Sequence, residues 1–449
     1  MKFSEKKVTL SIASIYAFRM LGLFVILPIF SLYADKIIDA TPTLMGLALG
    51  IYGLTQALLQ IILGIFSDYY GRKPIIIFGL VLFIIGSIVC AASTTIYGII
   101  IGRALQGAGA IGSTLTALIA DVTKEENRMK AMSVIGMTIG LSFIGAMVLS
   151  PILNSLVGLS GIFWLTALLG AIGIFILVFM VPTPKKIMVH RDSETVAGQI
   201  KKVLVLPELL RLNVGIFTLH AILTALFLVI PVILESYIGI SETRQWLVYL
   251  PVLVISFVIM VPFIIIAETK NKMKSIFVGA IFILTVMQFL LFEFDRHVIV
   301  MSVLLILFFS SFTLLEAALP SLVSKIAPVG SKGTAMGVYS NAQFFGIFIG
   351  GVLGGVVFHH SGIKGVFILN GLLGLIWFII ALTMKKPKQL SSKIISLKQF
   401  KNQYCADSLR QKILNLPGVE EAMVCMDEYV AYLKVDKKHF NEQDFTTIM

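Results

Sequence analysis

Three charged residues interrupt long apolar runs of this chain and are its first candidates for chemistry: Arg19, Arg103 and Glu316. On insertion scales, a charged side chain at the centre of a bilayer costs roughly 2.5–3.5 kcal/mol, so each should face an aqueous cavity or a partner. Glu316 is the only acid deep within an apolar run. A carrier driven by protons needs a group that changes its charge inside the membrane, which makes Glu316 a candidate proton or substrate site. The alternative is a structural ion pair with a distant arginine.

Polar residues in the same kind of apolar run extend this candidate set. Gln106 follows Arg103 by three residues, so the two side chains share one face of a helix. Asn213 and His220 lie in another run, and both are cavity candidates. The competing interpretations are structural. Arg103 could bond to backbone carbonyls, and a lone histidine is more often a packing residue than a proton carrier.

The sharpest pattern in the chain is Gly64-Ile65-Phe66-Ser67-Asp68-Tyr69-Tyr70-Gly71-Arg72-Lys73-Pro74. Gly64 and Gly71 allow a tight reversal between two helices, and the proline suits the first turn of the second helix. Asp68 is the unusual member, since an acid at the face of a membrane needs a cation or a helix amino end to offset its desolvation. The competing interpretation is a generic basic turn.

The elements that position these residues are membrane spans. Residues AVILMFWYC make up 57% of the 449 residues, charged residues make up 13%, and the mean hydropathy is +0.96. Soluble domains are nearer 45–50% apolar and about 25% charged, which excludes an ordinary soluble enzyme and a disordered chain. Apolar runs of about 20 residues can cross a bilayer as helices. We predict twelve of them: 9–33, 44–66, 74–93, 95–119, 131–156, 162–181, 209–234, 244–267, 275–292, 298–320, 335–358 and 364–384.

The net charge of +12 gives the orientation. If the amino terminus is cytoplasmic, the inner segments up to residue 388 hold 22 lysines and arginines. The outer loops then hold four: Lys36, Arg244, Arg296 and Lys364. By the positive-inside rule, this bias predicts a multi-pass protein of the cell inner membrane with both termini in the cytoplasm. The excess charge therefore serves orientation, and no nucleic-acid partner is expected.

The spans divide into two sets of six. A polar segment separates them, and residues 118–145 resemble residues 322–349 at an offset of 204. The predicted organisation is an amino-terminal bundle (1–181), a central cytoplasmic loop (182–208), a carboxy-terminal bundle (209–384), a linker (385–392) and a cytoplasmic domain (393–449). The fold class is an all-α membrane protein with a small α+β tail.

The tail predicts a β-α-β-β-α order, which is a ferredoxin-like layout without its last strand. The expected strands are 394–397, 422–426 and 429–435, and the expected helices are 405–415 and 441–449. Small metal-carrier domains of this layout bind metal through a Cys-x-x-Cys pair, which this tail lacks. We therefore expect no metal and no cofactor, and interpret the tail as a regulatory or assembly domain that contacts the cytoplasmic face or a ligand.

The twelve spans, the 6+6 division and two motifs resemble the major facilitator superfamily. The segment from Gly64 to Lys73 is similar to its inner-loop signature G-x-x-x-D-(R/K)-x-G-R-(R/K), with Tyr69 in place of a basic residue. The segment that begins at Arg103 resembles the fourth-helix motif of its proton-driven antiporters. A superfamily fold with a ferredoxin-like tail resembles the YajR-type transporters.

The resemblance implies roles for the inner-loop residues. Asp68 would lie against the amino end of the eleventh helix, near Gly337, and hold the two halves closed on the inside. Arg72 would pair with Asp121 at the inner end of the fourth helix. The antiporter pattern of the fifth span is partial, because the Gly-Pro of the family is Ser150-Pro151 here.

We therefore expect a secondary transporter that exports a small organic or drug-like solute in exchange for protons, by alternating access. Its partners would be the solute, protons and the lipid bilayer. No Walker A loop indicates ATP as the energy source, and no arrangement of residues typical of an intramembrane enzyme is present in the sequence. Two alternatives stay open: a proton symporter, and a non-transporting sensor that signals through its carboxy-terminal domain.

Overall fold

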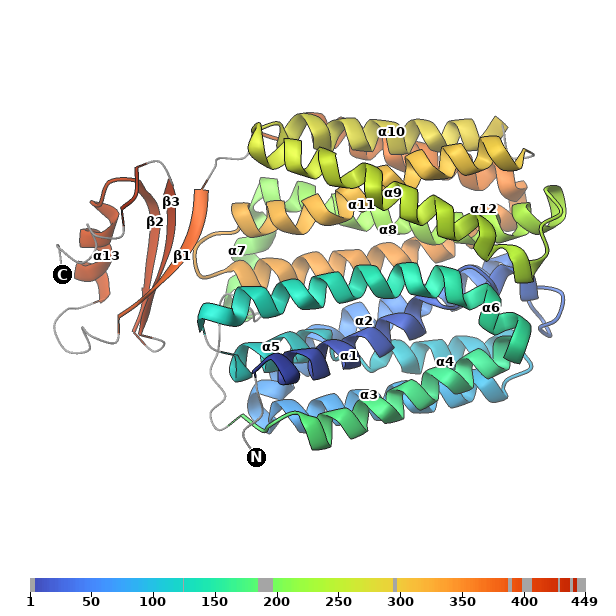
Figure 1. Ribbon diagram of the computed structural model, residues 1–449, viewed down its shortest axis with the longest axis horizontal. Helices are drawn as coiled ribbons and strands as arrows, with labels where there is room; N and C mark the ends of the chain where they lie inside the picture. The colour runs from blue at the N-terminus through green and yellow to red at the C-terminus, as the bar shows by residue number, and fades with distance from the viewer. Residues whose placement is uncertain are drawn as a thin grey trace.

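The protein is a bundle of long helices with a small sheet at one end (Figure 1). The computed structural model describes residues 5–123, 125–184, 197–293, 297–386, 390–397, 406–426, 429–436 and 439–441. Following the predicted orientation, we call the end that carries the sheet the inner end and the opposite end the outer end. The first helix begins at the inner end, next to which the sheet lies.

The first half of the chain forms one bundle. Its helices are α1 (Glu5–Phe24), α2 (Pro42–Tyr70), α3 (Arg72–Ala92), α4 (Ile96–Ala108), α5 (Gly112–Val122) and α6 (Glu125–Met180). The predicted spans are recovered with two differences. The first span was predicted to end at residue 33, but α1 ends at Phe24 and is followed by turns and a 3-10 helix, because Pro28 lacks the N–H that would bond to the Phe24 carbonyl. The fourth span is broken at residues 109–111, so that α4 and α5 are two separate helices. Hydropathy alone gave no sign of this break, because the residues around it are small and apolar.

The second half forms the other bundle. After a short helix α7 (Ile200–Val205), it contains α8 (Pro207–Val232), α9 (Trp246–Thr269), α10 (Met273–Glu293), α11 (Val298–Ile326) and α12 (Lys332–Leu382). Within the described residues, nine helices are long and apolar enough to cross a membrane. Two of these, α6 and α12, each contain two spans, and α4 and α5 together form another, which confirms the twelve-span fold.

The internal repeat is visible at the two points where long helices reverse. Gly158 divides α6 and Gly362 divides α12, with φ of 67° and 65°. Glycine enters this left-handed region without the Cβ clash that other residues meet, so each can link two spans without a loop. The two positions are 204 residues apart, the offset of the predicted sequence repeat. The two halves therefore share this turn as well as their order of helices.

The two bundles contact each other closely toward their outer ends. A Cβ on Gly46 of α2 would lie 2.1 Å from the carbonyl oxygen of Gly351 in α12, so no side chain fits between these backbones. Lys36 and Asn154 both reach Glu242 of the other half, at 3.7 Å and 3.3 Å. Among the described residues, no hydrogen bond or ion pair joins the two inner ends. The structure is therefore sealed on the outer side.

The hydrophobic core follows the same division. One cluster runs through the whole second bundle and the outer part of the first, where it includes Phe24 and Phe143. A separate cluster fills only the inner part of the first bundle, with Ile12, Leu80 and Leu118 among its members. Because the inner cluster does not join the second bundle, the first bundle can move against the second at this end without breaking a common core.

The tail forms a three-stranded antiparallel sheet with one described helix. The strands are β1 (Leu390–Ser396), β2 (Val419–Cys425) and β3 (Val430–Asp436), in the order β1-β3-β2, and α13 (Ala406–Leu414) packs on the sheet. This order is the one that a ferredoxin-like β-α-β-β unit requires, which confirms the predicted layout as far as it is described. The predicted helix 441–449 lies almost wholly outside the described residues.

The sheet contacts the inner loop between α11 and α12. The carboxylate of Glu421 accepts a hydrogen bond from the backbone N–H of Val329 at 3.2 Å. Lys434, which is buried, donates to the carbonyl of Ile326 at 3.2 Å and to Glu421 at 3.2 Å. Val329 also packs against the cluster of Cys425, Val430 and Tyr432. Two strands of the tail therefore hold the loop that precedes α12.

Candidate functional site

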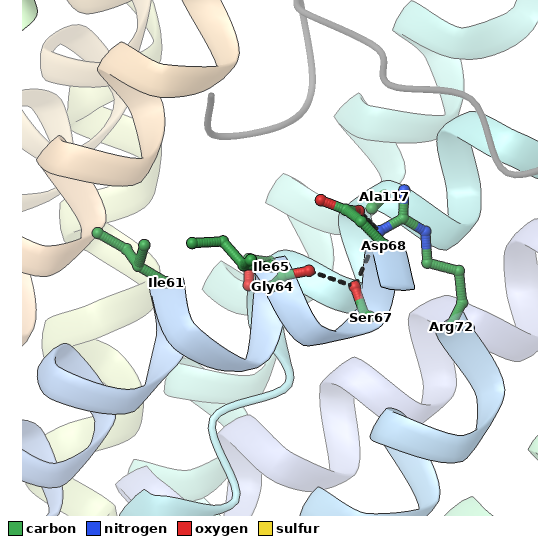
Figure 2. A pocket seen from close by; sticks show the side chains of 8 residues that line it. Ile61, Gly64, Ile65, Ser67, Asp68, Arg72 and Ala117 are labelled. Carbon is green, nitrogen blue, oxygen red and sulfur yellow. Dashed lines mark hydrogen bonds and ion pairs between the residues drawn. The ribbon is translucent and has the colours of Figure 1, made fainter. Parts of the chain in front are cut away.

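The inner-loop motif builds a polar cluster around Arg72, the first residue of α3. Its guanidinium donates to Asp121 Oδ2 at 2.9 Å, to Ser67 Oγ at 2.8 Å and to Asp68 Oδ1. Ser67 in turn donates to the carbonyl of Gly64 at 2.6 Å. Figure 2 shows Ser67, Asp68 and Arg72 turned toward one another at the wall of a small open pocket. The cluster ties the turn between α2 and α3 to the end of α5.

The glycines of the motif are required by local geometry. Gly71 ends α2 and precedes Arg72 with φ of 99°, a backbone conformation that side chains rarely adopt. Gly64 lies where a Cβ would be 3.1 Å from Ser113 Oγ, so α2 and α5 approach closely there. The motif therefore places Asp68 and Arg72 next to α5, the inner half of the fourth span.

Asp68 lies in this cluster and not against α12. Its carboxylate bonds to Arg72, and among the described residues no hydrogen bond joins it to α12. Gly337 lies in the second turn of α12. The family resemblance implies this contact for a state closed on the inner side, whereas this structure is closed on the outer side. The contact stays a prediction.

The second bundle also has an inner ion pair, in which a lysine takes the position of Asp121. Lys325 Nζ at the end of α11 lies 2.6 Å from Glu268 Oε1 of α9. Lys325 is 204 residues after Asp121, and Glu268 is 200 residues after Asp68. Both side chains are partly exposed, whereas Arg72 and Asp121 are buried. The repeat therefore places an inner ion pair in each half, and buries only the one that carries the motif.

Glu316, His220 and Gln343 meet in the second bundle. The amide nitrogen of Gln343 in α12 lies 2.8 Å from His220 Nε2 in α8 and donates to Glu316 Oε1 in α11 at 3.4 Å. His220 Nε2 and Glu316 Oε2 are 3.8 Å apart. Because the amide has two N–H groups, it can donate to the carboxylate and to a neutral imidazole protonated at Nδ1. Three helices thus converge on one ionisable pair.

The surroundings of this pair are apolar and aromatic. The ring of Phe312 lies 5.9 Å from that of His220, centroid to centroid, and Phe312 stacks in turn on Phe143 of the first bundle. The Glu316 side chain is 34% exposed while that of His220 is 4% exposed, so the carboxylate is the accessible member. Asn213 is buried two turns before His220 on α8 and makes no described hydrogen bond to either residue.

Arg103 is wholly buried in the first bundle. It donates to Gln106 Oε1 at 2.9 Å and to the carbonyl of Gly22 in α1 at 3.5 Å. Gln106 donates to Ser87 in α3 at 2.8 Å, and the guanidinium carbon lies 4.8 Å from the centroid of the Tyr52 ring in α2. These contacts join four spans. They suit the structural interpretation of Arg103 as well as a functional one.

Arg19 lies in a second buried network of the first bundle. It donates to Gln56 Oε1, and Gln56 donates to Gln60 Oε1 at 2.9 Å, which links α1 to α2. No described contact joins Arg19 to Glu316 or His220. Apart from Asn213, the predicted cavity residues form three groups in the structure: the Glu316 pair, the Arg103 network and the Arg19 network.

Sequence reasoning missed Gln343 and Ser67. Gln343 is an amide in an apolar span, as Gln56, Gln60 and Gln106 are, and nothing in its own run distinguishes it. Gln343 would have been proposed only by considering every polar residue of one span as a partner of every polar residue in the other spans. Ser67 lies inside the quoted motif, and its hydroxyl bond to Arg72 could be expected only once that turn was built.

Comparison with known proteins decides the family. A family model described as Major Facilitator Superfamily matches residues 12–351 and 274–414, which together cover most of the chain. The chain belongs to the major facilitator superfamily. The inner membrane transport protein YajR of Escherichia coli (strain K12) is 42% identical over 437 residues, which are 97% of this chain and 96% of YajR. The YajR-type resemblance is thereby confirmed.

Two further proteins show how far the likeness reaches. Multidrug resistance protein MdtH of Aeromonas hydrophila is 25% identical over 352 residues, 77% of this chain and 86% of that protein. A solved structure of a D-xylose-proton symporter aligns with a TM-score of 0.67 at 15% identity, over 85% of this chain and 98% of the other. The second is a likeness of fold. The chain is a multi-pass membrane protein of a transporter family, and its relative YajR is an inner-membrane protein.

Proposed function

We propose that this chain is a proton-coupled exporter of a small organic solute, with Glu316 as the residue that binds the proton. The observation that carries the proposal is the placement of the Glu316 carboxylate. It lies on α11 in an apolar span, is 34% exposed, and is bridged to His220 by Gln343. A carboxylate that can be neutralised by one proton changes its preference between an aqueous and an apolar environment. This is the property that couples a proton to a conformational change.

The neighbouring residues support this role. A neutral His220 accepts the Gln343 amide, so the pair holds a single negative charge when Glu316 is ionised. Among the described residues, Glu316 Oε2 has no hydrogen-bond donor. The carboxylate is therefore less stabilised than Asp121, which accepts from a guanidinium. Protonation of Glu316 removes a charge that the site compensates only through one amide.

In this proposal, the inner-loop cluster holds the inner ends of the two bundles together in one state of the transport cycle and releases them in the other. We call this role of the cluster the latch. In the outward-closed arrangement, Asp68 and Asp121 share Arg72. In the opposite state, rotation of the first bundle would bring Asp68 to the amino end of α12, whose partial positive charge favours a carboxylate. Lys325 and Glu268 would stay paired within the second bundle. The cytoplasmic orientation of this end is part of the proposal and follows from the distribution of lysines and arginines.

The tail is proposed to regulate this movement. Its sheet binds residues 326–329, immediately before α12 begins. Because this loop leads directly into α12, it sets the position of the amino end of that helix. A sensor without transport is the competing function, and the docked sheet is the observation that favours it.

The test begins with the solute. Growth of a deletion strain is screened against many toxic compounds, and a compound to which the strain is sensitised is then assayed in proteoliposomes under an imposed pH gradient. We expect the compound to cross the proteoliposome membrane at a rate that depends on the imposed pH gradient. No movement of any identified compound, together with ligand binding to the tail, would favour the sensor.

A further inference from the structure

The broken fourth span leaves backbone donors without acceptors inside the membrane region. The helix α5 starts at Gly112 after the irregular residues 109–111. Its first three N–H groups, on Gly112, Ser113 and Thr114, have no hydrogen-bond acceptor among the described residues. The hydroxyl of Thr114 is also buried without a partner. An amino end of this kind carries partial positive charge and attracts an anion.

A buried arginine points at the same place. Arg19 is 1% exposed, and its Nε and Nη1 atoms have no hydrogen-bond acceptor. Within the described part of the chain, its one hydrogen bond is to the neutral amide of Gln56, and no carboxylate pairs with it. A guanidinium within a membrane span without a counter-charge is costly, because its desolvation is not offset. The structure therefore holds a positive charge that lacks an anion.

The geometry around Gly112 brings these donors together. The position that a Cβ on Gly112 would occupy is 3.3 Å from Tyr16 Oη, 3.4 Å from Gln60 Oε1 and 3.7 Å from Arg19 Nη1. Because Gly112 has no side chain, these polar atoms lie close to its backbone at the start of α5. Gln60 presents an acceptor, which already receives the amide of Gln56. An anion would therefore bind on the side of Arg19 and Tyr16, which can both donate.

An open pocket borders the first turn of α5 on the inner side. The open pocket of Figure 2 is lined by Ser113 and Ala117 of α5 and by Gly64 of α2. Ser113 is the residue after Gly112 and donates to the carbonyl of Gln60 at 2.9 Å. The pocket therefore reaches Ser113, in the first turn of α5.

We propose that the break in the fourth span is a binding site for a small monovalent anionic group, held by Arg19 and by the amino end of α5. Broken spans whose helix amino ends face an anionic group are a known architecture of transport sites. The inference rests on the proposed function only in one respect, which is that a carboxylate here would belong to the exported solute.

The test measures binding without transport. The purified full-length protein in detergent is titrated with sodium benzoate or sodium chloride, in a sodium HEPES background of constant ionic strength, and its thermal unfolding is followed by tryptophan fluorescence. A ligand that binds only the folded protein raises the unfolding temperature, and we expect a saturable rise of roughly 2–4 °C. A rise with benzoate alone assigns the site to a carboxylate of the solute, and an equal rise with chloride assigns it to a free inorganic anion.

Matched variants locate the site. Gly112→Ala adds a methyl group between the start of α5 and these donors, 3.3 Å from Tyr16 Oη and 3.7 Å from Arg19 Nη1, and should abolish the rise. Gly279→Ala, a helical glycine of α10 with no atom within 4 Å of the added Cβ, should keep the rise. Arg19→Gln should also abolish it. The inference is overturned if neither salt stabilises the wild-type protein, or if the rise persists in Gly112→Ala. Because no gradient is applied, this result is independent of whether Glu316 couples transport to protons.

Discussion

The guanidinium of Arg72 donates to the carboxylate of Asp121 across 2.9 Å, and both side chains are buried at the inner end of the first bundle. Asp121→Asn should leave Arg72 with a buried charge and a weaker acceptor. Breaking one member of a buried ion pair costs about 3–5 kcal/mol, so the unfolding temperature in detergent should fall clearly.

The related pair in the second bundle provides the control. Glu268→Gln removes the partner of Lys325, but both side chains are partly exposed. Exposed pairs contribute about 1 kcal/mol or less, so the unfolding temperature should change little. Equal losses in the two variants would show that burial does not distinguish the two pairs.

Asp68 offers a prediction that separates function from stability. In this structure its carboxylate is bonded to Arg72 but not, among the described residues, to α12. Asp68→Asn should therefore express normally and lose transport, since the latch of the inner-closed state would lack its charge. Transport of the solute found by the growth screen measures this in proteoliposomes. Tyr69→Phe, at an exposed neighbouring position, is the control, and full activity of Asp68→Asn would refute the latch.

The outer seal depends on close backbone contact between α2 and α12. Gly46→Ala would place a methyl group 2.1 Å from the carbonyl oxygen of Gly351, so the two helices must separate. Spin labels at Tyr97 and Tyr237, which are exposed near the outer ends of the two bundles, should report longer distances in this variant. Gly279→Ala should leave the distance distribution as it is. An unchanged distribution in Gly46→Ala would mean that this contact does not seal the outer side.

The contact between the tail and the membrane bundle can be tested by hydrogen exchange. Glu421 accepts the backbone N–H of Val329 and pairs with Lys434. Glu421→Ala should release the sheet, and the backbone amides of Val329, Gly330 and Ser331 should exchange faster in the full-length protein. Ser408→Ala, at an exposed position of α13, should not alter this exchange. Equal exchange in both variants would argue against a docked tail.

The fold was predictable to the extent that it depends on hydropathy. Apolar runs of about 20 residues gave the twelve spans, because a bilayer demands that length from a helix. The breaks were not predictable in the same way. Residues 109–111 read as a continuous apolar run, and only the packing of small residues against α3 makes room for an irregular turn there. Gly109 illustrates this, since a Cβ on it would lie 2.3 Å from the carbonyl of Gly79.

The candidate site was predictable residue by residue but not as a set. A charge in an apolar run is conspicuous, so Arg19, Arg103 and Glu316 could be selected from sequence. Gln106, the partner of Arg103, is three residues away and could be expected from helix spacing. The amide partners of Arg19 and Glu316 are 37 and 27 residues away, and neutral amides carry no periodic signal. The pairing of Arg72 with Asp121, 49 residues apart, came from family resemblance and not from spacing.

The most direct test of the account is the coupling of solute movement to the proton gradient through Glu316. Proteoliposomes that contain wild-type protein or Glu316→Gln are loaded with the solute found by the growth screen, and its efflux is measured with and without an imposed pH gradient. The account predicts that the gradient accelerates efflux by the wild type and has no effect on efflux by Glu316→Gln, because the amide cannot take up the proton. Efflux by Glu316→Gln that depends on the gradient as strongly as in the wild type would contradict it.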